Sequence, residues 1–251
     1  QIHQCNVIHK SIQPANILLE AETGRVRLID FGISSRLSAE NNTMRSLQAL
    51  EGHLEYIAPE QTGRMNRLLD YRADLYSLGV VFYEMLTGKI PFAADDPLTL
   101  IHSHIAVTPD MGGVPEHLDR ILSKLLAKNA DDRYQSAFGL QHDLEQCAEQ
   151  LSKYGALVAF PLGQKDYSHQ FHLPQKLYGR SKEIEQLIGH FEKTSAGGSH
   201  LLLVAGYSGI GKSALVHEVH KPITEKRGFF ISGKYEQYQR NIPYFAFLKA
   251  F

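Results

Sequence analysis

The sequence predicts a multidomain protein, in which a mainly α-helical unit precedes the opening part of an α/β unit. Three observations support this prediction. Apolar residues repeat at helical spacing in several stretches between residues 74 and 151. The periodicity then stops between 154 and 176, where glycines and prolines interrupt a mixed polar stretch. Beyond it, helical patterns alternate with short apolar runs, as expected where helices cover a parallel sheet.

The first unit opens with two short apolar runs, Ile17–Leu19 and Val26–Ile29, which predict a β-hairpin because Thr23-Gly24 supplies a turn between them. Three amphipathic helices are expected after it. The first begins near Asp74 and ends at Gly88. The apolar positions of the three helices are Leu75, Leu78, Phe82, Met85 and Leu86; Leu118, Ile121, Leu122, Leu125 and Leu126; and Leu140, Leu144, Cys147 and Leu151.

The second unit is predicted to alternate helix and strand. Ile184–Phe191 has the pattern of a short helix, and Leu201–Ala205 is an apolar run typical of a buried strand. A further helix is expected from Ser213, and Gly228–Ser232 is expected to be the next strand.

Composition excludes several classes of protein. The 251 residues include 43% hydrophobic and 21% charged side chains, which is ordinary for globular domains. A net charge of -1 gives no broad positive field, so nucleic acid is not an expected partner. No apolar run approaches the roughly 20 residues of a membrane span, so membrane insertion is not expected. The two cysteines, Cys5 and Cys147, form no metal or disulfide pattern, and we expect a cytoplasmic protein.

Several motifs in the first unit occur in one order and at one spacing. The segment from His9 to Leu18 resembles the protein-kinase catalytic loop H-R-D-x-x-x-x-N, and the sequences D-F-G and A-P-E follow at 30–32 and 58–60. Asp74 is similar to the helical aspartate that anchors the catalytic loop, and Arg133 to the arginine that pairs with the glutamate of A-P-E. Residues 1 to about 150 therefore resemble the C-terminal lobe of a eukaryotic-type Ser/Thr protein kinase.

This resemblance implies specific roles for four side chains of a catalytic site. Asp30 would hold Mg²⁺ through a carboxylate oxygen, and Asn16 would offer a carbonyl oxygen to a second ion. Ser11 occupies the position at which kinases have the aspartate base, and Gln13 the position of a lysine that neutralises the transferred phosphate.

Three departures from the kinase pattern fall on residues that contact one another in that family. Ser11 carries no charge, Gln13 lacks a positive charge, and His53 stands where Ser/Thr kinases have a threonine. The loss of all three favours a degenerate, regulatory pseudokinase. The alternative is an active Ser/Thr kinase that transfers the γ-phosphate of ATP to proteins; a missing base commonly costs on the order of 10² to 10⁴ in rate.

The second unit contains a match to the phosphate-binding pattern G-x-x-x-x-G-K-[ST] at residues 206–213. Its glycines allow backbone N–H groups to surround phosphate oxygens, Lys212 would reach the β and γ phosphates, and Ser213 would place its hydroxyl on Mg²⁺. With Arg180 and the segment 240–244, the unit resembles the AAA/STAND-type ATPases. The expected ATP-binding residues are Gly206, Tyr207, Ser208, Gly209, Ile210, Gly211, Lys212 and Ser213.

The expected organisation is a kinase-like C-terminal lobe at 1–153, a linker at 154–176, and the N-terminal portion of a P-loop ATPase at 177–251. The order resembles that of large bacterial multidomain signalling kinases. We expect ATP and Mg²⁺ as cofactors, and protein partners or substrates of a signalling pathway. Because the kinase N-terminal lobe has no counterpart here, the chain is expected to be a fragment.

Overall fold

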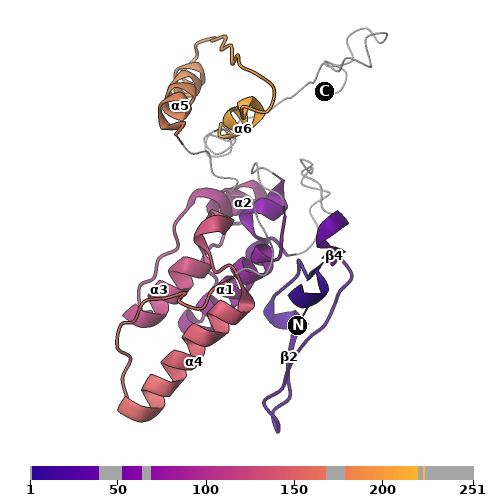
Figure 1. Cartoon of the computed structure of the whole chain (residues 1–251), viewed down its shortest axis with the longest axis vertical. Helices are drawn as coiled ribbons and strands as arrows, with labels where there is room; N and C mark the ends of the chain where they lie inside the picture. The colour runs from indigo at the N-terminus through magenta and orange to yellow at the C-terminus, as the bar shows by residue number, and fades with distance from the viewer. Residues whose placement is uncertain (1, 40–52, 64–68, 168–178, 220–222, 224–251) are drawn as a thin grey trace. The chain divides into compact units, whose positions relative to one another are not determined.

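The computed structural model describes residues 2–39, 53–63, 69–167, 179–219 and 223. The chain divides into two compact units, Gln1–Gly179 and Arg180–Phe251 (Figure 1). Each unit is described by itself below. None of the helices in the described ranges combines the length and the apolar composition that crossing a bilayer requires.

Two small antiparallel sheets form the start of the first unit. Strand β2 (Ile17–Leu19) pairs with β3 (Val26–Leu28) in the register Ile17 to Leu28, which confirms the predicted hairpin. Strand β1 (Val7–Ile8) pairs with β4 (Ser35–Arg36). Figure 1 shows the β2–β3 hairpin projecting from the helical body.

In the described residues of this unit, four α-helices follow the sheets, and the three predicted ones are among them. Residue Gly88, in the left-handed conformation, ends α1, while Asp96 and Ser136 cap the N-termini of α2 and α4 with their side chains. The helices are α1 (Arg72–Thr87), α2 (Pro97–Ala106), α3 (Glu116–Leu125) and α4 (Ala137–Tyr154). Short 3₁₀ turns are η1 (His3–Cys5), η2 (Pro14–Asn16), η3 (Leu37–Ala39), η5 (Leu54–Tyr56), η6 (Pro59–Thr62) and η7 (Ala130–Asp132).

Helix α1 contributes to both apolar clusters of the first unit. Its residues Tyr76 and Val80 pack with Leu122 and Leu126, whereas Leu75 packs with a second cluster on α3 and α4. All of these side chains are almost completely buried. Because one helix joins both clusters, the loops that precede and follow it are held against a common core.

Part of the segment expected to be a linker packs on the helical unit. Three of its apolar residues, Leu157, Phe160 and Leu162, lie against the second cluster. The side chain of Asp166 bonds to residues at the start of α4. Residues 168–176, the remainder of that segment, lie outside the described residues.

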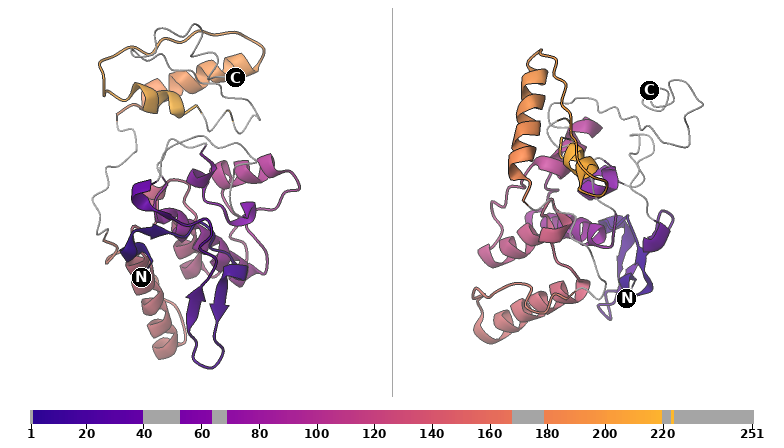
Figure 2. Two further views of the ribbon diagram at one scale, coloured as in Figure 1. Left: turned by 90° about the vertical axis from the view of Figure 1, so that its right-hand side faces the viewer. Right: turned by 45° about the horizontal axis from the view of Figure 1, so that its top comes forward.

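The second unit contains α5 (Ser181–Ser195) and α6 (Lys212–His217), which lie next to each other (Figure 2). They meet through Leu187 and Leu215, with Val219 and Ile223. Both correspond to predicted helices.

The prediction of a buried strand at Leu201–Ala205 is wrong for the described structure. The segment has no strand assignment, and Leu201 and Leu203 are 99% and 89% exposed. The physical reason is that a strand needs a neighbour to bond its backbone, and none in the described ranges pairs with it. The other predicted strand, 228–232, lies outside these ranges.

Candidate functional site

Asp74 of α1 holds the loop that contains the predicted catalytic residues. Its Oδ2 accepts the backbone N–H of His9 at 2.9 Å, and its Oδ1 accepts that of Lys10 at 2.8 Å. The ring Nε2 of His3 lies 2.9 Å from the same carboxylate. Because this carboxylate is completely buried, its oxygens fix the loop against the core of the helical unit.

Three of the four predicted catalytic side chains meet in this loop. The Asn16 amide nitrogen donates to the Ser11 carbonyl at 2.8 Å and to the Ser11 hydroxyl at 3.0 Å. The Gln13 amide lies 3.5 Å from the same hydroxyl. These bonds use the amide N–H₂ of Asn16 and leave its side-chain oxygen for another ligand, such as a cation.

The fourth residue, Asp30, reaches the same region through the backbone. The N–H of Ile29 donates to the Asn16 carbonyl at 3.0 Å, and the Ile29 carbonyl oxygen lies 3.0 Å from His9 Nε2. Asp30 itself is exposed, has a positive φ of 60°, and accepts the Gly32 N–H at 3.4 Å. The described bonds therefore place the Asp30 backbone beside Asn16, with no direct bond between the two side chains.

The three residues that depart from the kinase pattern line one small pocket. Ser11, Gln13 and His53 surround it together with Lys10 and Tyr56. The Tyr56 hydroxyl donates to Glu84 at 2.7 Å. Burial, and to a smaller extent this hydrogen bond, raises the pKa of the phenol, so Tyr56 stays protonated. The pocket consequently presents a Ser11 hydroxyl and a Gln13 amide where a kinase would have a carboxylate and an ammonium, and a His53 imidazole in place of a threonine.

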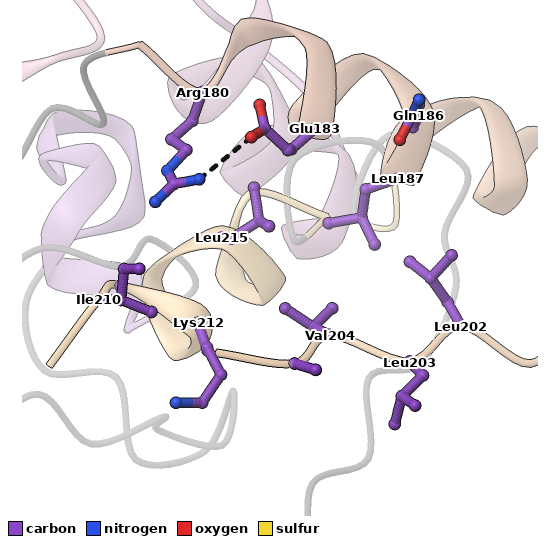
Figure 3. A pocket seen from close by; sticks show the side chains of 12 residues that line it. Arg180, Glu183, Gln186, Leu187, Leu202, Leu203, Val204, Ile210, Lys212 and Leu215 are labelled. Carbon is purple, nitrogen blue, oxygen red and sulfur yellow. Dashed lines mark hydrogen bonds and ion pairs between the residues drawn. The ribbon is translucent and has the colours of Figure 1, made fainter. Parts of the chain in front are cut away.

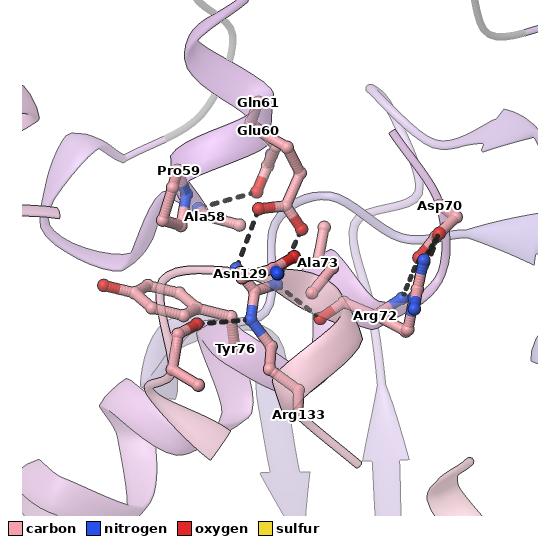
Figure 4. A network of polar contacts seen from close by, with 12 residues as sticks. Ala58, Pro59, Glu60, Gln61, Asp70, Arg72, Ala73, Tyr76, Asn129 and Arg133 are labelled. Carbon is pink, nitrogen blue, oxygen red and sulfur yellow. Dashed lines mark hydrogen bonds and ion pairs between the residues drawn. The ribbon is translucent and has the colours of Figure 1, made fainter. Parts of the chain in front are cut away.

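A buried ion pair joins the A-P-E segment to Arg133, the residue that follows η7. Arg133 donates from Nη1 to Glu60 Oε1 at 2.6 Å and from Nη2 to Glu60 Oε2 at 2.9 Å (Figure 4). Its other three N–H groups donate to backbone carbonyls, those of Arg72, Ala127 and Lys128. All five guanidinium donors are therefore used, and both side chains are almost fully buried.

Two further cationic or titratable groups lie beside this pair. The pKa of Lys128 is lowered to about 7, mainly by burial and to a smaller extent by the nearby charge of Arg133. The Lys128 Nζ lies 4.4 Å from the centre of the Phe92 ring. The pKa of His104 is lowered to about 3, mainly by burial and to a smaller extent by the charge of Lys128. His104 also lies 3.0 Å from the Tyr76 hydroxyl through Nδ1. Neutral His104 is consequently the form that suits this apolar region.

The predicted phosphate-binding segment forms a turn before α6. Gly209 and Gly211 have φ values of 81° and 93°, which other residues rarely adopt, and Gly211 is the N-cap of α6. The Lys212 ammonium donates to the carbonyls of Gly206 and Tyr207, both at 2.8 Å. The lysine thus bends back over its own loop, while Ser213 is exposed.

A pocket of about 290 Å³ adjoins this turn (Figure 3). It lies within the second unit and is lined by α5, the 202–205 segment and the turn itself. Arg180 borders the pocket and also pairs with Glu183 at 3.1 Å. The volume is close to the lower limit for small-molecule sites.

The structure adds residues that the sequence patterns do not mark. Gln61 connects the two kinase-like segments, since its amide donates to the Lys10 carbonyl at 3.0 Å and its oxygen accepts the Ala58 N–H at 2.9 Å. His3 is a second addition, through Asp74. Both act through tertiary contacts, and the one available signal was their closeness in sequence to recognised motifs.

Comparison with known protein families assigns both units. Residues 1–144 match the family model for the protein kinase domain, and residues 176–251 match that for the AAA ATPase domain. Members of these families generally use ATP and Mg²⁺.

Individual relatives agree with this assignment. The chain is 38% identical over 220 residues to the hybrid signal transduction histidine kinase G of Dictyostelium discoideum, an alignment that covers 78% of the chain and 6% of that protein. It is 37% identical over 147 residues to the serine/threonine-protein kinase PknB of Mycobacterium tuberculosis, covering 57% of the chain and 23% of the kinase. A probable serine/threonine-protein kinase of Streptomyces coelicolor is 36% identical over 152 residues, covering 59% and 22%. The chain therefore spans less than a quarter of the length of each of these relatives.

The recognised motifs, the buried ion pair between Glu60 and Arg133, and the matched family models lead to one assignment: the chain belongs to the protein kinase domain family and carries an AAA ATPase domain behind the kinase-like one.

Proposed function

We propose that this chain is part of a signalling protein in which a degenerate kinase-like lobe acts as a regulatory or recognition surface and is coupled to an ATP-binding P-loop module. In this proposal residues 1–153 are the C-terminal lobe, 154–176 the linker, and 177–251 the N-terminal portion of the ATPase. The two free thiols, exposed Cys5 and buried Cys147, are compatible with the expected cytoplasmic location.

One observation carries the proposal: Ser11, Gln13 and His53 line the same small pocket. A phosphoryl-transfer site needs a group that accepts the proton of the attacking hydroxyl and a cation beside the transferred phosphate. Ser11 in this pocket is neutral and bonded to Asn16, and the neighbouring Gln13 is neutral as well. A single replacement could be compensated by neighbours, whereas three in one pocket remove both functions together.

The alternative is an active Ser/Thr kinase. Its support is that the contacts which hold the site together are intact: Asp74 holds the loop, and Arg133 holds Glu60. Among the described residues, the bonds of the Asn16 side chain use its amide nitrogen and not its oxygen. Asn16 and Asp30 would then hold Mg²⁺. Identities of 37% and 36% to two serine/threonine-protein kinases favour the same reading.

In the second unit, the residues fit a nucleotide with Mg²⁺. The turn at 206–213 supplies backbone N–H groups, Lys212 a charge for the β and γ phosphates, and Ser213 an exposed hydroxyl for the cation. Bound ATP would replace the two carbonyls that Lys212 contacts now. The nucleotide supplies phosphoryl groups, and these side chains orient them.

Phosphate transfer to a general protein substrate tests the two readings in the natural protein that carries this chain. The parent is compared with Asp30→Ala and with the triple variant Ser11→Asp, Gln13→Lys, His53→Thr. We expect a parent rate at background and a measurable gain in the triple variant.

A parent rate well above background that Asp30→Ala abolishes would overturn the degenerate reading in favour of the active kinase. The triple variant needs a control for folding, for which the circular dichroism spectrum and the melting temperature of parent and variant are compared.

A further inference from the structure

Residues 157–166, called the strap below, are attached to the kinase-like lobe by polar and apolar contacts along their length. Besides its three apolar residues on the second core cluster, the strap accepts Arg120 Nη1 at the Phe160 carbonyl at 3.2 Å. The N–H of Val158 donates to Gln150 Oε1 at 2.7 Å. A mere spacer between domains would need none of these bonds.

The main attachment is the carboxylate of Asp166, which is 4% exposed. Its Oδ2 accepts the backbone N–H of Gln135 at 2.8 Å, and its Oδ1 accepts the hydroxyl of Ser136 at 2.9 Å. Lys124 Nζ lies 3.7 Å away. Since the Ser136 hydroxyl in turn accepts the Gly139 N–H at the start of α4, Asp166 orients the residue that caps this helix.

The lobe has space for this carboxylate because residue 139 is a glycine. A Cβ on Gly139 would lie 2.3 Å from Asp166 Oδ1 and 2.5 Å from its Cβ. Neither distance is possible, so an alanine would displace the strap even though alanine is the better helix former.

A second buried carboxylate holds the middle of the strap. Asp143 of α4, which is 1% exposed, accepts the Gly163 N–H at 2.8 Å and the Tyr134 hydroxyl at 2.7 Å with the same oxygen. The strap is therefore connected to two residues within the 133–136 turn, to Tyr134 through Asp143 and to Gln135 through Asp166.

This turn includes Arg133, the partner of Glu60 in the buried ion pair. Gln135, whose N–H bonds to Asp166, donates from its side chain to the Arg133 carbonyl at 2.8 Å and accepts Arg72 Nη1 at 2.8 Å. A chain of hydrogen bonds thus connects Asp166, Gln135, Arg133 and Glu60.

We propose that the strap is the element through which the ATPase unit influences the kinase-like lobe: movement of the chain beyond residue 166 changes the Asp166 attachment, and this alters the 133–136 turn and the Arg133–Glu60 pair. The inference rests on the proposed coupling of the two units. It assigns to Asp166 and Gly139 a positioning role that neither family motif contains. The physical basis is a contiguous network of buried and partly buried hydrogen bonds.

Hydrogen exchange of the full chain, read by mass spectrometry, tests this proposal. Asp166→Asn removes the charge, and Gly139→Ala displaces the carboxylate without changing it. In both variants we expect roughly tenfold or faster exchange at the amides of Gln135 and Gly163, and also at those of Gln61 and Gly63, which bond within the Glu60 turn. Lys165→Gln, an exposed substitution within the strap, is the matched control and should exchange like the parent.

Faster exchange limited to Gln135 and Gly163, with parent rates at Gln61 and Gly63, would overturn the proposed connection between the strap and the Arg133–Glu60 pair. The variants are compared without nucleotide, so this result does not depend on the P-loop. A second comparison adds ATP and Mg²⁺: a change at Gln61 and Gly63 in the parent that Asp166→Asn abolishes supports this connection, and bound nucleotide without any change there counts against it. Absence of nucleotide binding, measured separately, would contradict the proposed function instead.

Discussion

The Arg133–Glu60 pair and the pocket of Ser11, Gln13 and His53 lie in the same lobe but differ in the charge of their side chains. At the pair, one carboxylate and one guanidinium are buried together, and every guanidinium donor has an acceptor. At the pocket, the two positions that hold the aspartate base and the lysine in a kinase are the neutral Ser11 and Gln13. The buried pair supports the fold whether or not phosphate is transferred, whereas charge at the pocket would serve the reaction alone. A chain can thus keep the contacts that support an enzyme's fold and still lack charged groups that the enzyme's chemistry requires.

The largest expected effect follows from breaking the buried pair. Arg133→Ala leaves the Glu60 carboxylate buried without a partner, and we expect the free energy of unfolding to fall by about 3 to 5 kcal/mol. Urea unfolding followed by circular dichroism measures it. Lys153→Ala, which removes an exposed ion pair with Glu149, should leave the unfolding curve unchanged. A similar small change in both variants would show that the Arg133 network does not stabilise the lobe.

A smaller effect is expected at the anchor of the catalytic loop. Asp74→Asn keeps one acceptor but turns an amide N–H₂ toward a backbone N–H of His9 or Lys10, at a cost of about 2 kcal/mol. Amide exchange at His9 and Lys10 should accelerate more than exchange in α3. Asp95→Asn, a substitution of an exposed carboxylate, serves as the control. Unchanged exchange at both amides would mean that other contacts fix the loop.

The P-loop gives the corresponding prediction for a site whose charge is present. Lys212→Ala should weaken ATP binding about tenfold or more, because an ammonium that contacts phosphate oxygens is lost. Titration with a fluorescent ATP analogue measures the dissociation constant. Lys193→Ala removes an exposed lysine of α5 and should bind like the parent. Equal affinities for both variants would exclude Lys212 from the nucleotide site.

The smallest effect concerns pH. The pKa of His104 is lowered from its usual 6.5 to about 3, so between these values the unfolded chain binds a proton that the folded chain does not. The free energy of unfolding should therefore decrease as the pH falls, by about 1 kcal/mol between pH 6.5 and 5.5. His104→Gln removes the titrating group, and its unfolding free energy should depend less on pH in this interval. Parallel pH profiles for parent and variant would contradict the assignment.

The sequence predicted well those features that depend on local pattern. The hairpin and the helices appear where periodicity and turn residues place them, and the spacing of Glu60 and Arg133 led to a pair that the structure forms. Ser11, Gln13 and Asn16 also come together, because one short loop carries all three. The metal-binding and nucleotide-binding roles of these residues remain predictions.

Features that depend on distant partners were not predictable. The run at 201–205 has the composition of a buried strand, but burial requires neighbouring strands that composition cannot supply. The docking of residues 157–166 was missed because the glycines and prolines that interrupt the segment are typical of a spacer. Its attachment depends on Asp166 occupying the space that a Cβ at residue 139 would fill. Gln61 was missed for the same reason, since its two bonds join segments that are far apart in sequence.

Two residues of the kinase-like loop region, Lys10 and Asp30, have φ values of 67° and 60°, although neither is a glycine. Side chains in this conformation cost on the order of 1 kcal/mol each, so the surrounding bonds must impose it. The main chain around Ser11 is thus set independently of the groups it now presents. To engineer a phosphotransfer centre here, one would consequently need to exchange side chains and not to rebuild the backbone.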